Sequence, residues 1–484
     1  MDSSTRRQRR KSDLRKKRRR TRRRQTLKRT LIVILIVAIC CAAAFLVFIT
    51  VRAVRNNREA EAEAALQGQV VELDEEALIG TPAEADLAEA ERLADMYDYD
   101  AAIEYLQNSD YYDSTPEYQA KVDEYNEVKD NLVAWEPENV THIFFHTLIV
   151  DPSKAWDDDE KSEGYNQYMV TIDEFSKIIN TLYDEGYVMV SMHDMCEVSD
   201  DGKVTRKDIY LPEGKTPFVI SQDDVSYYHY MGGDGFADKL VLDENGNVKC
   251  EYIEDDGSVS VGDYDLVPWI DTFVEAHPDF SYLGHKGTIA LTGYEGVLGY
   301  RTDEVYRTQD ESRFTSFQRQ FFIDNPDFDE ATWEQEVADA TAVADAMKAE
   351  GWEFASHTWG HIYPLGVGLE SFEEDTEKWI ENVEPIVGPT DIIIFAFGAD
   401  ITSDWTEYPS DNEYFRFLKD EGFDIFCVVD SSQYYVQFNG ESLRMGRRNI
   451  DGFRMYYNPG MLQDLFEVDD VWDKARPDEV APIG

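Results

Sequence analysis

The stretch ADATAVADAMKAEGWEFASHTWGH, residues 338–361, contains an Ala-rich helix, a glycine turn and a short apolar strand that ends in polar residues. Similar helices and short apolar strands recur at 141–150, 170–195, 216–224, 267–293, 375–400 and 412–430. Helices that alternate with short buried strands predict a parallel sheet. At least six such units within about 320 residues predict an α/β fold, a distorted (β/α) barrel of about seven strands. The chemistry is expected at the C-terminal ends of the strands.

The regions around this barrel, which we place at 139–466, differ in composition. Residues 236–265 contain the turn sequences ENGN and DDGS, which predict a β-hairpin or small meander within an insertion at about 226–285. The insertion either covers the site or decorates the barrel. Residues 52–134 are rich in Ala and Glu with helical spacing, which predicts a helical stalk containing one pair of the tetratricopeptide type. Residues 467–484 predict an acidic C-terminal tail.

The charge of the chain excludes some classes of function. The 484 residues include 46 Lys and Arg against 98 Asp and Glu, so the formal net charge is -52. No nucleic-acid partner is expected, because such binding depends on basic residues that neutralise phosphates. A hydrophobic content of 43% excludes a wholly disordered chain, and 5 Cys in this length exclude a disulfide-rich scaffold.

The N-terminus reverses this charge. Residues 1–29 form a basic tail, and an uncharged apolar run follows within residues 30–51. About 20 apolar residues suffice to cross a bilayer, so the run predicts a single transmembrane helix. The positive-inside rule then predicts a cell-membrane protein with a cytoplasmic N-terminus and an extracellular C-terminal domain. A cleaved signal peptide and a lipoprotein are the alternatives; the length of the run and the residues before Cys40 and Cys41 favour the uncleaved helix.

Two pairs of polar residues follow predicted strands. Asp223 and Asp224 end the strand PFVISQDD, where one carboxylate can bind a cation while the other handles a proton. His357 and His361 follow the strand WEFAS, and imidazole is a common ligand of zinc and similar metals. The chain has only 8 His, yet His142 and His146 have the same four-residue spacing as His357 and His361. Spacing alone therefore does not identify metal ligands.

A strand-end Asp-Asp followed by a strand-end His-x-x-x-His resembles the polysaccharide deacetylase family, the NodB-like carbohydrate esterases, over about residues 140–460. The resemblance implies that Asp224, His357 and His361 hold a divalent metal, zinc by expectation, with an open position for water or substrate. It also implies that Asp223 is the general base. The family's Arg-x-Pro-Tyr motif corresponds to FAFG at 395–398, which implies that the backbone N–H of Phe397 stabilises the oxyanion.

The sequence departs from the family pattern at three places. Phe395 stands where the family has an Arg beside the base. Gln222 and Val225 flank the two acids in place of the family's usual aromatic residue and glycine. No histidine follows residue 361, although the family has a C-terminal His as general acid; the corresponding region is MGRRNIDGFRMYYN, residues 445–458. Arg447 or Arg448 is expected to neutralise Asp223 or to contact substrate. Arginine is no general acid near neutral pH, so His146 is the candidate proton donor, with a packed strand residue as the alternative.

These residues predict a metal-dependent hydrolase that removes acetyl groups from envelope polysaccharide such as N-acetyl amino sugars, peptidoglycan or exopolysaccharide. Trp359, between the two predicted His ligands, is a candidate for stacking on a sugar ring. Two alternatives stay open because of the missing Arg and His. One is an O-acetyl esterase, whose leaving group needs less acid assistance, and the other is a non-catalytic carbohydrate-binding or envelope scaffold protein on the same fold.

Overall fold

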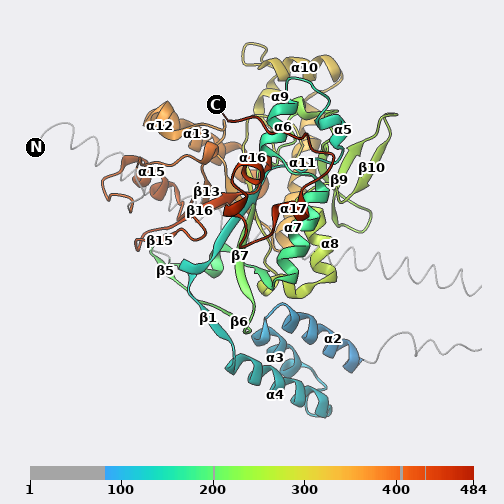
Figure 1. Ribbon diagram of the computed structural model, residues 1–484, viewed down its shortest axis with the longest axis vertical. Helices are drawn as coiled ribbons and strands as arrows, with labels where there is room; N and C mark the ends of the chain where they lie inside the picture. Colours follow the sequence, from blue (N-terminus) through green and yellow to red (C-terminus); the bar gives the residue numbers. More distant parts are fainter. Residues whose placement is uncertain (1–81, 200–201, 404–406, 431, 484) are drawn as a thin grey trace, which may run out of the picture. The chain divides into compact units, whose positions relative to one another are not determined.

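Seven parallel strands form a closed ring in the computed structural model, which describes residues 82–199, 202–403, 407–430 and 432–483. The strands pair in chain order, and the last pairs with the first. This closed α/β barrel confirms the prediction of about seven strands (Figure 1). The strands are β2 (Thr141–Phe145), β7 (Thr216–Asp223), β11 (Thr288–Leu291), β12 (Glu353–Ser356), β13 (Ile392–Ile394), β14 (Ile425–Val429) and β16 (Leu443–Asn449).

The ring is irregular where strands are short. Strands β12 and β13 share one registered pair, Ser356 with Ile393. Strand β3 (Tyr187–Met189), expected as a barrel strand, pairs with the first residues of β7, while β11 pairs with its last residues. β3 therefore lies outside the ring, and the chain then turns at Ser191, whose hydroxyl caps the 3-10 turn η3 (Met192–Asp194). β15 (Val436–Phe438) adds an antiparallel strand to β16.

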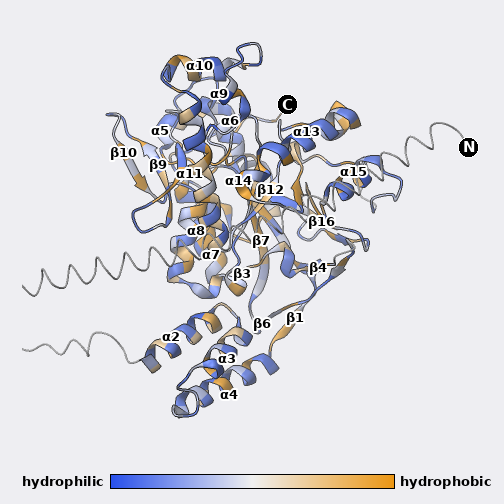
Figure 2. Ribbon diagram, turned by 180° about the vertical axis from the view of Figure 1, so that it is seen from behind, coloured by the Kyte–Doolittle hydropathy of each residue, from blue (hydrophilic) through white to orange (hydrophobic). Residues whose placement is uncertain are grey.

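Amphipathic helices cover the outside of the barrel. Thr171 and Glu174 form a capping box that starts α7, and its buried residues recur at helical spacing. Gly351 makes the turn before β12 at φ +95°, and a Cβ there would lie 2.1 Å from the Gly284 carbonyl oxygen, so no larger residue fits. Figure 2 shows mixed hydrophobic and hydrophilic residues along these helices. The principal helices are α7 (Ile172–Asp184), α8 (Leu266–Ala276), α11 (Glu330–Ala349), α13 (Leu369–Asn382) and α15 (Glu413–Glu421).

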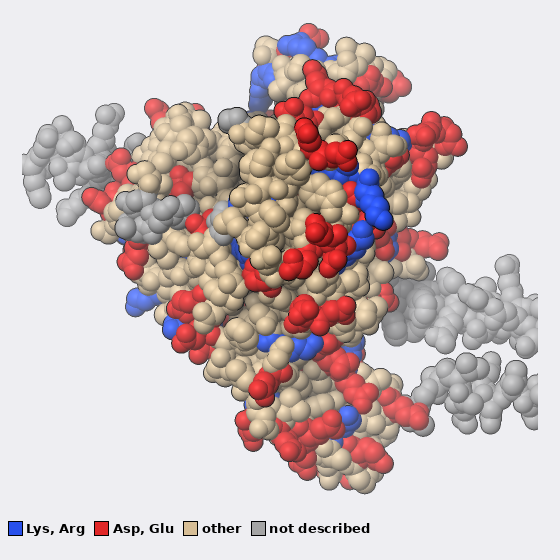
Figure 3. All heavy atoms as spheres, viewed as in Figure 1, with Lys and Arg blue, Asp and Glu red and all other residues tan. Residues whose placement is uncertain are grey.

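Shorter elements connect these units. Small antiparallel pairs join β1 (Val133–Trp135) to β6 (Ile209–Leu211) and β4 (Cys196–Val198) to β5 (Val204–Arg206). The short helices are α5 (Pro152–Ala155), α6 (Ser162–Tyr168), α9 (Glu304–Thr308), α10 (Ser316–Asp324), α12 (Pro364–Val367), α14 (Glu384–Val387), α16 (Gly452–Tyr457) and α17 (Val468–Val471). The face in Figure 3 carries many more Asp and Glu than Lys and Arg side chains, in keeping with the acidic composition.

The insertion is a three-stranded antiparallel meander, β8 (Lys239–Leu242), β9 (Val248–Ile253) and β10 (Val259–Gly262), with β9 in the middle. It buries Leu240, Val248 and Cys250 in the main core of the barrel. This apolar contact holds the meander on the barrel wall beside α8 and α11.

From residue 82 onward, where the structure describes the chain, three helices precede the barrel: α2 (Pro82–Asp95), α3 (Tyr99–Asn108) and α4 (Pro116–Asp130). Their buried residues share one hydrophobic cluster with residues of β3, β13 and β14. The Tyr97 hydroxyl donates to the Asp279 carbonyl oxygen (2.7 Å), and the Leu283 N–H donates to the Met96 carbonyl oxygen (2.8 Å). This part of the predicted stalk therefore packs on the barrel, and residues 52–81 lie outside the described residues.

The predicted location in a membrane requires correction. In the described part of the chain, no helix is both long enough and apolar enough to cross a bilayer. The basic tail at 1–29 and the anchor predicted at 30–51 lie outside the described residues. This finding contradicts the predicted single-pass location with an extracellular C-terminal domain.

The C-terminal segment is part of the fold. Arg476 is buried and its guanidinium binds both oxygens of Glu174 in α7, at 2.9 Å from Nε and 2.6 Å from Nη2. The same guanidinium donates to carbonyl oxygens of Asn166 and Met169. The sequence predicted an acidic tail over 467–484; these contacts, together with buried Val480, fix the segment against α6 and α7.

A histidine connects elements at the opposite end of the barrel from the strand-end Asp and His residues. The two ring nitrogens of His193 lie 2.6 Å from a Glu353 carboxylate oxygen and 3.1 Å from an Asp391 carboxylate oxygen. These acids start β12 and precede β13. Burial alone would lower the pKa of His193, but the hydrogen bonds to Asp391 and Glu353 raise it to about 10.

We expect the contribution of His193 to stability to depend on pH. Because the folded-state pKa is raised, the contribution is fully present below about pH 6.5 and is lost as pH rises toward about 10. The side chain is 39% exposed, so screening limits the contribution to about 1 kcal/mol. Urea unfolding of wild type and His193→Gln between pH 6 and pH 10 measures this contribution. The control is His277→Gln, because the ring of His277 lies against Tyr183. If the difference in free energy of unfolding between wild type and His193→Gln does not change with pH, this expectation is refuted.

Candidate metal centre and active site

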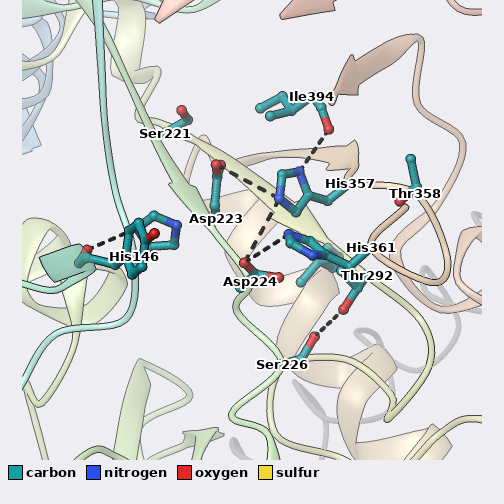
Figure 4. Close-up of polar contacts among 12 residues, drawn as sticks. His146, Ser221, Asp223, Asp224, Ser226, Thr292, His357, Thr358, His361 and Ile394 are labelled. Carbon is teal, nitrogen blue, oxygen red and sulfur yellow. Dashed lines mark hydrogen bonds and ion pairs between the residues drawn. The ribbon is translucent and has the colours of Figure 1, made fainter. Parts of the chain in front are cut away.

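The polar residues predicted to carry chemistry lie at the C-terminal ends of the barrel strands, the usual position of active sites in this architecture. Each follows or ends a strand, so the closure of the ring brings together residues that are far apart in the sequence (Figure 4). They are His146 after β2, Asp223 and Asp224 at the end of β7, His357 and His361 after β12, Phe397 after β13, and Arg447 in β16.

Three of these residues form a candidate metal centre. One ligand atom from each of Asp224, His357 and His361 lies within 4.8 Å of the others. The Asp224 Oδ2 atom is 4.0 Å from His357 Nε2 and 3.6 Å from His361 Nε2. Ligands about 2.0–2.1 Å from a tetrahedral zinc ion lie about 3.3 Å apart, so small side-chain shifts suffice to bind one. The donor set of two imidazoles and one carboxylate fits zinc.

Neighbouring groups orient these ligand atoms. The Nδ1–H group of His357 donates to the Ile394 carbonyl oxygen (2.8 Å), which leaves Nε2 unprotonated toward Asp224. The Tyr228 hydroxyl donates to Asp224 Oδ1 (2.7 Å), so the other oxygen faces the imidazoles. Tyr228 also lies 2.7 Å from the Thr292 hydroxyl. Nothing in the local sequence marked Tyr228 as a hydrogen-bond donor to this site.

Backbone strain is concentrated at this site. Asp224, Thr358, His361 and Phe397 have φ values of 60°, 63°, 49° and 59°. Residues other than glycine seldom adopt this left-handed region, and each instance costs about 1–3 kcal/mol. Such residues persist only where surrounding contacts hold them, and they are frequent at active sites.

The second strand-end acid, Asp223, is paired with Arg447. Two guanidinium nitrogens donate to its two carboxylate oxygens at 2.7 and 2.9 Å, and both side chains are buried. Burial by itself would raise the pKa of Asp223, but Arg447, with a smaller contribution from His357, holds it well below the ordinary range. The carboxyl group is therefore ionised at neutral pH. Arg447 is thus the positively charged partner of Asp223, a partner that Phe395 cannot be.

The adjacent Arg448 points elsewhere, because consecutive side chains of a strand alternate between faces. Its guanidinium binds the Asp464 carboxylate at 2.7 and 2.8 Å. The indole of Trp359 packs on the main hydrophobic core, where a Cβ on Gly293 would meet it, and Lys378 lies over its ring. Its surroundings are those of a packed core residue.

The two histidines of the first strand have different environments. His142 is buried beneath the site with Nε2 2.8 Å from the Ser221 hydroxyl, and burial lowers its pKa. His146 is half-buried, and its Nδ1–H group donates to the Tyr168 carbonyl oxygen (3.1 Å). That bond fixes the tautomer and leaves Nε2 free. In Figure 4, His146 lies on the opposite side of Asp223 and Asp224 from the two predicted His ligands.

Phe397 lies at the open side of the site. Its side chain is 70% exposed, and its ring centroid is 4.3 Å from that of His361. The residue belongs to the single 3-10 turn η7 (Ala396–Gly398), and the first N–H groups of such a turn have no acceptor within it. The aromatic ring of Phe397 therefore lies next to a predicted metal ligand.

Gln222, one of the departures from the family pattern, supports the strand end. Its amide donates to Asp265 Oδ1 (2.7 Å) and to the His146 carbonyl oxygen (3.3 Å). Asp265 also accepts from the Tyr227 hydroxyl (2.5 Å) and caps α8. This buried carboxylate holds residues on both sides of the two strand-end acids, and its role depends on tertiary contacts that no sequence motif indicates.

The chain was compared with protein families, curated proteins and solved structures. No protein-family model and no curated protein matches the chain. Among solved structures it is similar to the Streptococcus pyogenes deacetylase PplD in complex with acetate, over 69% of this chain and 98% of that chain, with 11% identity and a TM-score of 0.31.

Proposed function

We propose that this chain is a metal-dependent hydrolase that removes acetyl groups from acetylated amino-sugar polymers. The observation that supports this proposal is the convergence of Asp224, His357 and His361 beside a second carboxylate, Asp223, held ionised by Arg447. A three-ligand site with an adjacent base is the arrangement that metal-assisted hydrolysis needs.

The residues of the chain have separate roles in this proposal. A bound zinc ion would polarise the acetyl carbonyl and acidify a water molecule. Asp223 accepts the proton of the attacking water, and Arg447 keeps that carboxylate ionised and oriented. The Phe397 backbone N–H donates to the oxyanion of the tetrahedral intermediate.

The departing amine requires a proton, and His146 is the proposed donor. Its Nδ1–H group is engaged by the Tyr168 carbonyl, so Nε2 carries the transferred proton. Arginine keeps its proton in this pH range, which excludes Arg447 from that role. A first-strand histidine therefore takes the place of the C-terminal histidine that this sequence lacks.

Acetate release from acetylated chito-oligomers and peptidoglycan, measured with zinc supplied, tests this proposal. We expect Asp224→Ala to lower the rate at least about 10³-fold, because several kcal/mol of charge stabilisation are lost. Chelation should abolish release and added zinc should restore it. The control is Asp345→Ala, which removes a carboxylate paired with Lys348 on α11.

Other outcomes reject the proposal in distinct ways. Release from O-acetyl esters alone would identify an esterase. If the folded, zinc-loaded protein binds these polymers but releases no acetate from amides or esters, the barrel is a sugar-binding protein. Equal rates for wild type and Asp224→Ala would exclude the predicted metal centre from the reaction.

A further inference from the structure

The loop that carries two predicted metal ligands is held in a strained conformation. Between His357 and His361, Thr358 is left-handed at φ 63°, and His361 itself is left-handed at φ 49°. The positions of the two imidazoles depend on these backbone angles. A loop with two such residues relaxes toward ordinary angles unless outside contacts hold it.

One carboxylate from a separate element provides such contacts. Asp375, in α13, accepts hydrogen bonds from two consecutive backbone N–H groups in the middle of the loop. Its Oδ1 is 2.7 Å from the Trp359 nitrogen, and its Oδ2 is 2.8 Å from the Gly360 nitrogen. Hydrogen bonds to an ionised acceptor are stronger than neutral ones, and two of them fix both position and orientation.

The loop is shaped to receive this carboxylate. A Cβ on Gly360 would lie 3.0 Å from Asp375 Oδ2, so the close approach favours glycine. On the other side, the Trp359 carbonyl oxygen accepts from the N–H groups of Gly293 (2.9 Å) and Tyr294 (3.1 Å). The loop is therefore held between α13 and the segment that follows β11.

The charge of Asp375 is retained at neutral pH. Burial raises its pKa to about 6, and the N–H groups of Gly360 and Trp359, with the Lys378 ammonium, oppose that shift. Lys378 lies one turn further along α13 and rests on the Trp359 ring. The helix thus brings a carboxylate and its compensating cation to the same loop.

We propose that Asp375 is a positioning residue for the metal centre: by binding the N–H groups of Trp359 and Gly360 it sets the geometry of His357 and His361. This inference rests on the metal site of the proposed function. Asp375 touches neither ligand and acts through the loop backbone. Removal of comparable supporting contacts weakens metal affinity about 10–100-fold.

The test is zinc affinity, measured by competition with a chromophoric chelator at pH 7.5, with no substrate present. In Asp375→Asn, the amide NH₂ faces one of the two backbone N–H donors, so one hydrogen bond is replaced by a repulsive contact. We expect about 10–100-fold weaker zinc binding. Glu374→Gln is the matched control, because it removes the same charge from an exposed neighbouring residue of the same helix. That control should bind zinc as wild type does.

A second variant approaches the same contact from the loop. Gly360→Ala places a methyl group against Asp375 Oδ2 and should weaken zinc binding to a similar degree. If both variants act through one contact, the double variant should bind no more weakly than the worse single variant. Urea unfolding without metal shows whether each variant is folded, and Gly360→Ala carries the test if Asp375→Asn is not.

The outcomes separate this inference from the proposed function. Zinc binding within twofold of wild type in folded Asp375→Asn would overturn the positioning role and leave the metal centre intact. Equal weakening in Glu374→Gln would overturn it in favour of a general charge effect. If wild type itself binds no zinc, the metal centre fails and this inference fails with it.

Discussion

Replacing Arg447 by methionine is expected to lower kcat/KM for acetate release by about 10²–10³-fold. The guanidinium makes two hydrogen bonds to Asp223, and both side chains are buried. Without it, burial raises the pKa of Asp223, so a larger fraction of the carboxyl groups holds a proton and fewer can accept one from water. Loss of general-base assistance costs about 10²–10⁴-fold.

The pH profile and a neighbouring residue make this prediction specific. Activity of Arg447→Met should recover as pH rises, because Asp223 then ionises, and the ratio of wild-type to variant activity should fall over the same range. Arg448→Met is the matched control: the adjacent arginine binds Asp464 on the other face of β16, and its variant should stay within a few-fold of wild type. Equal losses in the two variants would contradict the assignment of Arg447.

Replacing Arg476 by methionine is expected to reduce the free energy of unfolding by about 3–5 kcal/mol. This is the usual loss when one partner of a buried ion pair is removed and a charge is left unpaired, here on Glu174. Small domains are stable by about 5–15 kcal/mol, so the loss is a large fraction of the total.

A set of variants separates the ion pair from packing. Glu174→Gln alone should also be strongly destabilising, and the double variant Glu174→Gln with Arg476→Met should lose less than the sum. Arg416→Met removes an exposed pair with Glu441 and should cost no more than about 1 kcal/mol. Urea unfolding monitored by circular dichroism measures all four. A loss below about 1 kcal/mol for Arg476→Met would show that the C-terminal segment contributes little to stability.

The barrel was predictable because its signal is local and repeated. Most units have a helix and a glycine turn before a strand rich in apolar residues, as parallel strands with both faces buried require. The last barrel strand, β16 (LRMGRRN), contains three arginines, does not fit this pattern and was not predicted from the sequence. By contrast, β3 has the same local pattern as a barrel strand. Its exclusion follows from competition with β11 for one side of β7, which only the assembled sheet reveals.

The site was predictable in part. Strand ends meet at one edge of a parallel barrel, so Asp224 and the His-x-x-x-His segment could be placed together from order alone. The sequence left Arg447 and Arg448 undecided, because a one-residue shift in register exchanges the faces of a strand. Asp375 and Tyr228 were missed as supporting residues, since each acts through hydrogen bonds across the fold. The predicted membrane location was wrong, because none of the described helices is long and apolar enough to cross a bilayer.

The closure of the ring by its last strand has a consequence for synthesis. β2 leaves the ribosome first among the barrel strands, yet its partner β16, which also carries Arg447, emerges last. Until then the nascent chain has both strand-end acids and both loop histidines but lacks the guanidinium that neutralises Asp223. The proposed active site can therefore be assembled only after β16 has emerged, and chains that end before β16 contain the proposed ligands without Arg447.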